Sequence, residues 1–274
     1  NYTTDYYFPW YVKTFSNLYN VVNENRDDAQ ISIGSTANVA VSYDNGKDHL
    51  TSVDFFNKLI SSGCSKYINA FAFHMYDSKM DNQNRFETNL SKLKNNINNN
   101  GGFINLDITE YGISSYNDIT EEMQGYKLVK DSITLDKNNI RIQTMYNGWN
   151  VGTNISNSEH NYGILYNNYT PKPAYYTMKN YYENTNGANY IGTLNNLEEI
   201  ENANLEVHVY NKDGKPKIIA WANNSKTITI PYNNFTATDI YGNIIENVDG
   251  TLKITTSPVY LDNISTEYFY EAIS

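Results

Sequence analysis

The decisive stretch is Phe103-Ile-Asn-Leu-Asp-Ile-Thr-Glu-Tyr-Gly112, where an apolar run ends in a carboxylate, an aromatic ring and a glycine. Its pattern predicts a buried β-strand over Phe103–Thr109. A glutamate at the end of such a strand is costly to bury unless its charge is hydrogen bonded or used in chemistry. Glu110 is therefore the first candidate for a functional residue, against the plainer alternative of an ion pair with a neighbouring helix.

The sequence does not determine on which face of the strand Glu110 lies. Strict two-residue alternation would place Glu110 with the apolar side chains of the strand, and would leave Asn105 and Asp107 on the other face. A bulge, which inserts one extra residue, would reverse this assignment. The sequence does not say whether the strand contains a bulge.

Three more β-like runs, Ile31–Ile33, Ile68–Met75 and Ile140–Met145, recur along the chain. The four runs start at residues 31, 68, 103 and 140, so successive starts lie 35 to 37 residues apart. Each gap contains an apolar pattern with helical spacing, which is clearest between residues 86 and 97. Such alternation predicts right-handed βαβ units and a parallel sheet. An open doubly wound sheet and half of a (β/α)8 barrel both fit it.

The ends of the chain complete this organisation. A helical pattern precedes the first strand at residues 12–22. Another begins near Pro173, and a proline is suited to the first turn of a helix because the amide there has no hydrogen-bond partner within the helix. From about residue 187 the pattern changes to short alternating runs separated by turns: Leu205–Tyr210, Lys217–Ala222, Thr227–Pro231 and Thr251–Thr255. These runs predict a small antiparallel β-sandwich.

Polar and aromatic residues follow the predicted parallel strands. His74-Met-Tyr76 ends the second strand, Glu110 ends the third, and Tyr146-Asn-Gly-Trp149 follows the fourth. Parallel α/β folds place their functional sites at the carboxyl ends of strands. We therefore expect these side chains to form one site, although a lone histidine such as His74 is more often structural.

Several of these motifs resemble clan A glycoside hydrolases, especially families 39 and 5. Thr109-Glu-Tyr-Gly112 is similar to the Thr-Glu-aromatic-Gly pattern of their seventh strand, and His74-x-Tyr76 to their sixth-strand motif. The passage between Glu159 and Ala174 resembles the one after their eighth strand. The tail, with Asp239–Asn243 and Ser257–Tyr260, resembles their β-sandwich. The order and spacing of the motifs carry the resemblance, which spans essentially the whole chain.

The resemblance implies an α/β fold in which residues 1–186 form the C-terminal half of a (β/α)8 TIM barrel, from the family's fourth helix to its eighth. Residues 187–274 would then be a C-terminal β-sandwich domain. Four parallel strands cannot close a small barrel. The family's acid/base glutamate follows an asparagine at the fourth strand, and the one Asn-Glu pair here, Asn23-Glu24, lies in a helical pattern. The resemblance thus places the second carboxylate in a missing first half, as a separate chain, a cleaved one or an upstream segment.

The same resemblance assigns the site residues. It implies a retaining glycoside hydrolase of a β-linked polysaccharide or oligosaccharide, with Glu110 as the nucleophile. Tyr76 would orient that carboxylate, His74 would line the cleft, and Tyr146 and Trp149 would contact the substrate. It also implies a secreted or cell-surface bacterial protein with no metal and no cofactor.

Composition excludes other classes of function. The net charge is −10, and no cluster of Lys and Arg suits a nucleic acid. No apolar run approaches the length of a membrane span, and the single Cys64 permits no internal disulfide. A doubly wound domain would need a Gly-rich loop after a strand, whereas Ser61–Gly63 and Asn100–Gly102 precede strands. The main alternative to an enzyme is a non-catalytic carbohydrate-binding or surface protein on a degenerate barrel.

Overall fold

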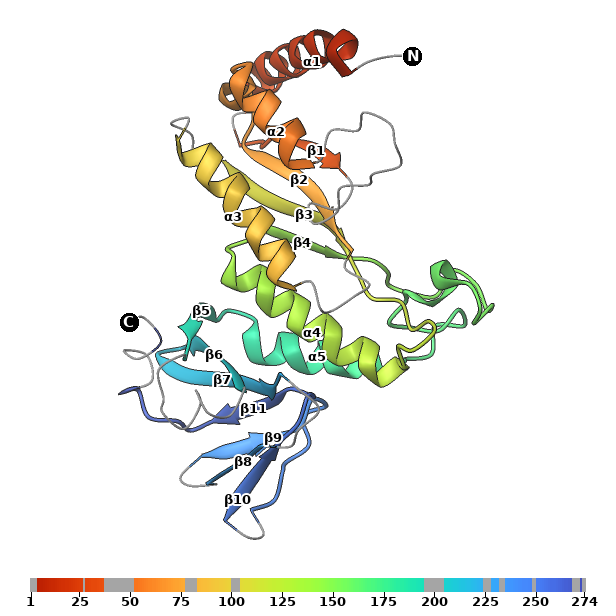
Figure 1. Ribbon diagram of the computed structural model, residues 1–274, viewed down its shortest axis with the longest axis vertical. Helices are drawn as coiled ribbons and strands as arrows, with labels where there is room; N and C mark the ends of the chain where they lie inside the picture. The colour runs from red at the N-terminus through yellow and green to blue at the C-terminus, as the bar shows by residue number, and fades with distance from the viewer. Residues whose placement is uncertain are drawn as a thin grey trace. The chain divides into compact units, whose positions relative to one another are not determined.

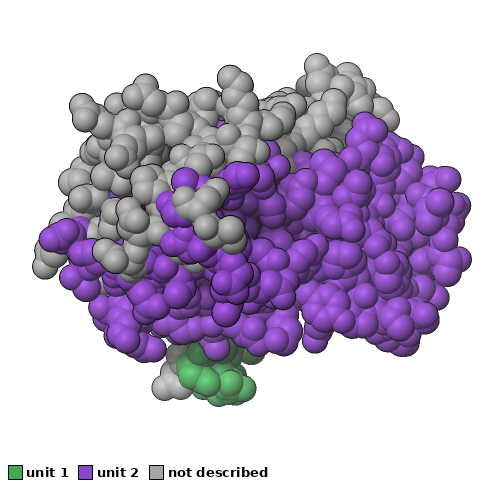
Figure 2. Space-filling model, turned by 90° about the horizontal axis from the view of Figure 1, so that it is seen from below, with its two compact units in different colours: residues 1–113, 139–146 green, residues 114–138, 147–274 purple. Residues whose placement is uncertain are grey.

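The computed structural model describes residues 4–26, 28–36, 52–76, 83–99, 104–194, 205–223, 228–231, 235–247, 250–267 and 272. The chain divides into two compact units, which Figure 2 colours separately. The first contains residues 1–113 and 139–146, and the second contains residues 114–138 and 147–274.

A four-stranded parallel sheet forms the first unit (Figure 1). Its strands lie in chain order: β1 (Ser32–Thr36), β2 (Ala70–Met75), β3 (Asn105–Tyr111) and β4 (Ile142–Met145). All three strand pairs are parallel, which confirms the prediction from the repeat of 35 to 37 residues. The predicted start of the third strand, Phe103, lies outside the described residues.

Helices cover one face of this sheet: α1 (Thr4–Asn25), α2 (Ser52–Ser61) and α3 (Gln83–Asn99), with a 3-10 turn, η1 (Cys64–Tyr67), before β2. The ring of Phe56 in α2 stacks on Phe71 of β2 with centroids 4.2 Å apart, and meets Phe73 at 6.3 Å. Leu90 and Leu93 of α3 are fully buried. The odd-numbered side chains of β2 therefore point to the helices.

The second unit contains two long helices, α4 (Glu121–Lys137) and α5 (Pro173–Thr185), and a 3-10 turn, η3 (Ser158–Asn161). Thr120 caps α4, since its hydroxyl accepts a hydrogen bond from the amide of Met123 at 3.1 Å. Pro173 occupies the first turn of α5, as its sequence predicts.

The C-terminal part of this unit is an antiparallel sandwich, as predicted. A five-stranded sheet has the order β5-β6-β7-β11-β9, and β10 pairs with β8. Its inner face is an apolar core that includes Val207, Ile218, Leu252 and Leu261. The strands are β5 (Asn189–Thr193), β6 (Leu205–Lys212), β7 (Lys215–Ala222), β8 (Ile228–Pro231), β9 (Thr236–Thr238), β10 (Thr251–Ile254) and β11 (Val259–Asp262).

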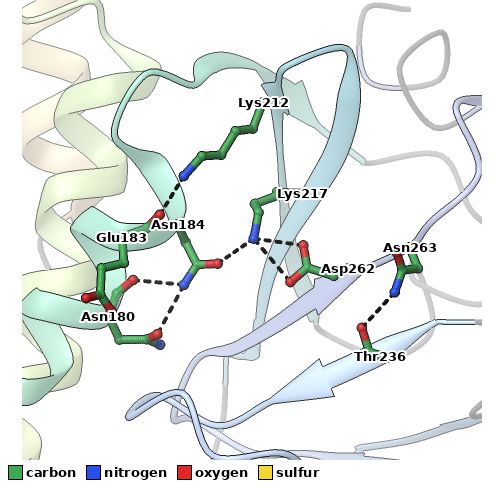
Figure 3. Close-up of polar contacts among 8 residues, drawn as sticks. All are labelled: Asn180, Glu183, Asn184, Lys212, Lys217, Thr236, Asp262 and Asn263. Carbon is green, nitrogen blue, oxygen red and sulfur yellow. Dashed lines mark hydrogen bonds and ion pairs between the residues drawn. The ribbon is translucent and has the colours of Figure 1, made fainter.

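Polar side chains join α5 to the sandwich within this unit (Figure 3). The ammonium group of Lys217 on β7 donates to Asn184 Oδ1 at 2.6 Å and forms an ion pair with Asp262 at 2.8 Å. Lys212 donates to the backbone carbonyl of Glu183 at 2.5 Å. These contacts explain why the helix and the sandwich form one compact unit. The domain boundary at residue 186 stays a prediction.

Candidate active site

A β-bulge decides the orientation of Glu110. In the pairing of β2 with β3, Phe73 lies opposite Ile108, but the next residue of β2, His74, lies opposite Glu110. Thr109 is therefore an extra residue in β3. The pairing of β3 with β4 shows an irregularity in the same stretch, between Ile108 and Tyr111.

The bulge places Glu110 on the face of the sheet that the helices do not cover. Residues that lie opposite each other in a sheet point to the same side, so Glu110 points with His74, and Asp107 points with Ala72. The helices occupy the other side, where Phe71 contacts α2. The question that the sequence left open is thus answered, and strict alternation would have given the wrong face.

Two side chains converge on one oxygen of the Glu110 carboxylate. The hydroxyl of Tyr76 donates a hydrogen bond to Oε2 at 2.7 Å. His74 Nδ1 lies 3.4 Å from the same oxygen. The side chains of His74 and Glu110 are 21% and 39% exposed, so the carboxylate is held and still accessible. The expected convergence of these three residues at one end of the sheet is confirmed.

The two rings that contact this carboxylate belong to a series of three packed rings. The rings of His74 and Tyr76 meet edge to face with centroids 6.1 Å apart, and Tyr76 meets Tyr146 in the same way, also at 6.1 Å. Edge-to-face contacts between successive rings fix their orientations. The structure therefore brings Tyr146 together with His74, Tyr76 and Glu110.

Two polar groups at this site were not predicted from the sequence. Ser35 on β1 contacts His74, with its hydroxyl oxygen 3.2 Å from Nε2, and it also contacts the hydroxyl of Thr109 at 3.0 Å. Ser35 follows the β-like run Ile31–Ile33, but its contact with His74 depends on a register shift between Gly34 and Thr36 that the sequence does not show.

An ion pair whose carboxylate is buried lies on the same face of the sheet as Glu110. Asp107 is 1% exposed and accepts two hydrogen bonds from the Arg141 guanidinium, at 2.9 Å from Nε and 2.6 Å from Nη2. These bonds to the Asp107 carboxylate raise the pKa of Arg141 above its usual value. The pair joins β3 to the start of β4 and so supports the strand that carries Glu110.

Trp149 belongs to the second unit. It is 46% exposed, pairs with Leu165 as an isolated parallel bridge, and meets the ring of Tyr169 at 6.0 Å. Gly163 packs directly against the backbone of Trp149 and Asn150, where a Cβ atom would lie only 2.1 Å from their atoms. Its expected contact with a sugar beside Glu110 stays a prediction.

Two further observations bear on what the described residues can bind. They contain no group of three or more His, Cys, Asp or Glu side chains arranged to hold a metal ion. None of the helices within the described ranges is long and apolar enough to cross a membrane.

Comparison with solved structures identifies the fold. A family 39 glycoside hydrolase from the gut symbiont Bacteroides cellulosilyticus WH2 matches 93% of this chain with a TM-score of 0.73 and 17% identity. A conserved exported protein from Bacteroides fragilis matches 92% with a TM-score of 0.61 and 13% identity. A beta-porphyranase of glycoside hydrolase family 86 from Bacteroides plebeius matches 93% with a TM-score of 0.56 and 12% identity. No protein-family model and no curated protein matches the sequence.

The fold is therefore that of the C-terminal part of clan A TIM-barrel glycoside hydrolases. The chain spans about half the length of these three structures, covering 55%, 58% and 52% of them. The resemblance to family 39 inferred from the motifs agrees with this result.

Proposed function

We propose that this chain carries the nucleophile of a retaining glycoside hydrolase that acts on a β-linked polysaccharide or oligosaccharide. The observation that carries the proposal is the Glu110 carboxylate, which lies at the carboxyl end of a parallel strand, faces away from the helices and is held by Tyr76 at 2.7 Å. Active sites of barrel enzymes lie at this end of the strands.

The contacts of Glu110 suit direct attack on an anomeric carbon. Tyr76 and His74 both contact Oε2, and Oε1 accepts no hydrogen bond from any residue in the described ranges. In the proposed reaction Oε1 forms a bond to the anomeric carbon while the leaving-group oxygen departs with a proton from the acid/base residue. Water then hydrolyses the glycosyl-enzyme ester and releases Glu110.

The neighbouring rings would contact the sugar. His74 and Tyr146 flank the carboxylate through their contacts with Tyr76. Trp149 presents an exposed ring that would serve as an apolar floor beneath a pyranose. We infer that these residues bind substrate and that only Glu110 reacts covalently.

The proton donor would come from a complementary four-strand half, in the same polypeptide or in a separate chain. Within the described ranges, β1 and β4 each pair with a strand on one side only. Apolar side chains are exposed nearby: Trp10, Leu18 and Val21 on α1 are 65%, 44% and 57% exposed, and Ile142 on β4 is 46% exposed. A second set of strands and helices would cover them. Polysaccharide substrates suit a secreted or cell-surface bacterial enzyme, which we also propose.

The direct test is covalent labelling of Glu110. We would incubate the barrel completed with its other half with a 2-fluoro-glycoside that traps the glycosyl-enzyme, and map the modified peptide. We expect the label on the peptide that covers residues 103–115, and expect Glu110→Gln to abolish both labelling and turnover while sugar binding survives. Label on another carboxylate would refute the assignment. Sugar binding with no turnover by the wild-type barrel would favour the non-catalytic alternative.

A further inference from the structure

Two extra residues in the flanking strands meet beside His74. The register of β1 with β2 passes from Gly34 to Thr36 while β2 advances by one residue, so Ser35 is the extra residue of β1. Thr109 is the extra residue of β3. Their hydroxyl oxygens lie 3.0 Å apart, although the two strands are separated by β2.

The backbone at Ser35 is unusual for a residue with a side chain. Its φ is +62°, and φ of Gly34 is +115°. A Cβ at Gly34 would lie 2.5 Å from the carbonyl oxygen of Ala72, so the glycine permits the bulge. Positive φ at a non-glycine residue persists only where the surroundings hold it, and such residues cluster at functional sites. The bulge directs the Ser35 hydroxyl to His74.

The imidazole of His74 thus has a partner on each side. Ser35 Oγ lies 3.2 Å from Nε2, and Glu110 Oε2 lies 3.4 Å from Nδ1. An ionised carboxylate can only accept a hydrogen bond, whereas a hydroxyl can either donate or accept. A carboxylate 3.4 Å from Nδ1 favours a proton on that nitrogen, and Ser35 can contact Nε2 in either of its states.

We propose that Ser35, backed by Thr109, is a positioning residue that holds His74 with its Nδ1–H directed at Glu110. When the ring is neutral, Ser35 donates to Nε2 and Thr109 donates to Ser35. When the ring is protonated, Nε2–H donates to Ser35, which donates to Thr109. Thr109 then donates to the carbonyl of Phe73, 3.5 Å away. Both nitrogens keep a partner in either state.

The consequence for catalysis rests on the proposed function. Tyr76 donates to Oε2, and a proton on His74 Nδ1 directed at the same oxygen would help to fix the carboxylate plane, so that Oε1 is presented to the sugar in one orientation. Without Ser35 the ring would lose its second partner, and rotation would withdraw the proton from Glu110.

The test is ¹⁵N NMR of the histidine rings in residues 1–274, with His74→Asn to assign the signal among the four histidines of the chain. We expect neutral His74 to carry its proton on Nδ1. Ser35→Ala should reduce the Nδ1–H population by at least half. Ser61→Ala, which removes a hydroxyl bonded to the Asn57 carbonyl, is the matched control. The ring of His208, held by Tyr190 and Glu206 in the other unit, should not change in any variant and reports global folding.

An unchanged His74 ring in Ser35→Ala would overturn the proposal. Stoichiometric modification of Ser35 by a fluorophosphonate would also overturn it, because Ser35 would then be a nucleophile. In the completed barrel we expect Ser35→Ala to lower kcat about 10-fold to 100-fold with little change in KM. If Glu110→Gln abolishes turnover but Ser35→Ala does not lower it, only this inference fails. If Glu110→Gln leaves turnover intact while the ring still responds to Ser35, the proposed function fails and the positioning role stands.

Discussion

Tyr76 donates its phenolic hydrogen to Glu110 Oε2 at 2.7 Å, across adjacent parallel strands that a bulge has brought into this register. The bond joins a residue just after β2 to a residue at the end of β3. It requires both the pairing of the strands and the extra residue in β3, so it is the most informative contact for testing the site.

Removing this bond should slow the chemical step. In Tyr76→Phe the ring that packs on His74 and Tyr146 remains, but the carboxylate loses a donor. We expect kcat of the completed barrel to fall about 10²-fold to 10³-fold, as for other single donors to a reacting oxygen, with substrate binding retained. Steady-state kinetics on an aryl glycoside, beside Tyr67→Phe as a control from η1, would measure it. A loss confined to KM would show that Tyr76 only binds substrate.

Breaking the Asp107–Arg141 pair should destabilise the protein. Arg141→Met leaves the Asp107 carboxylate, which is 1% exposed, without the guanidinium that bonds both of its oxygens. An uncompensated buried charge costs about 3–5 kcal/mol. The double variant Asp107→Leu/Arg141→Met should recover most of this loss, because no charge remains buried. Urea unfolding of the three proteins measures the effect, and equal loss in the single and double variants would contradict it.

Lys130 predicts a specific pH dependence of stability. Lys130 is 5% exposed, and its ammonium group lies over the rings of Trp221 and Tyr126 at 5.1 and 5.7 Å. Burial lowers its pKa from 10.5 to about 8. Between these values the unfolded chain binds one more proton than the folded chain, so the Lys130 contribution to stability rises with pH across this window.

The comparison to make is between wild type and Lys130→Met. The variant lacks the titrating group, so its free energy of unfolding minus that of wild type should fall between pH 8 and 10.5. The fall should be about 2–3 kcal/mol, at about 1.4 kcal/mol for each pH unit. Below pH 8 the difference should be constant. Lys179→Met, at an exposed i,i+4 pair with Glu183, should show no such fall. A pH-independent difference for Lys130→Met would contradict the prediction.

Removing the hydroxyl group should change the stability of the protein in opposite directions at two tyrosines of the sandwich. Tyr260 Oη is buried and has no hydrogen-bond partner among the residues that the structure describes, and burial raises its pKa well above the usual value. Tyr210 is equally buried, but its hydroxyl donates to Asp136 at 2.9 Å. We expect Tyr260→Phe to stabilise by about 1 kcal/mol and Tyr210→Phe to destabilise by about 1–3 kcal/mol. Urea unfolding midpoints would measure both, and a shared sign would contradict the argument.

Regular elements of the first unit could be predicted because each repeats a pattern over many residues. The apolar spacing on α3 predicted the helix, and the alternation in β2 predicted the strand. The repeat of strand and helix along the chain predicted that the strands are parallel. Boundaries were less certain: the run predicted to begin at Ile68 starts as a strand at Ala70, because η1 precedes it. In the sandwich, β5, β9 and β11 were not predicted as strands: β9 has three residues, β11 has four, and β5 is interrupted by a register shift near Gly192.

The residues of the site that could be predicted are those whose type and position at a strand end are enough to mark them. Glu110, His74, Tyr76 and Tyr146 are polar or aromatic where their strands end, and the topology brings these ends together. Ser35 and Thr109 could not be predicted, because their position depends on bulges that follow from the pairing of distant strands. The partner of Asp107 was also hidden, since Arg141 contacts it only once β4 lies beside β3.

Because of the bulge at Thr109, the face of the sheet to which Glu110 points depends on the number of residues in β3. An odd number of residues added to a strand reverses the side to which every later side chain points. Deletion of Thr109 would change no other side chain, yet it would direct Glu110 into the layer of helices. A single insertion or deletion in β3 should therefore disable the site even where every other side chain is kept, so natural variation must preserve the length of the strand as well as its chemistry.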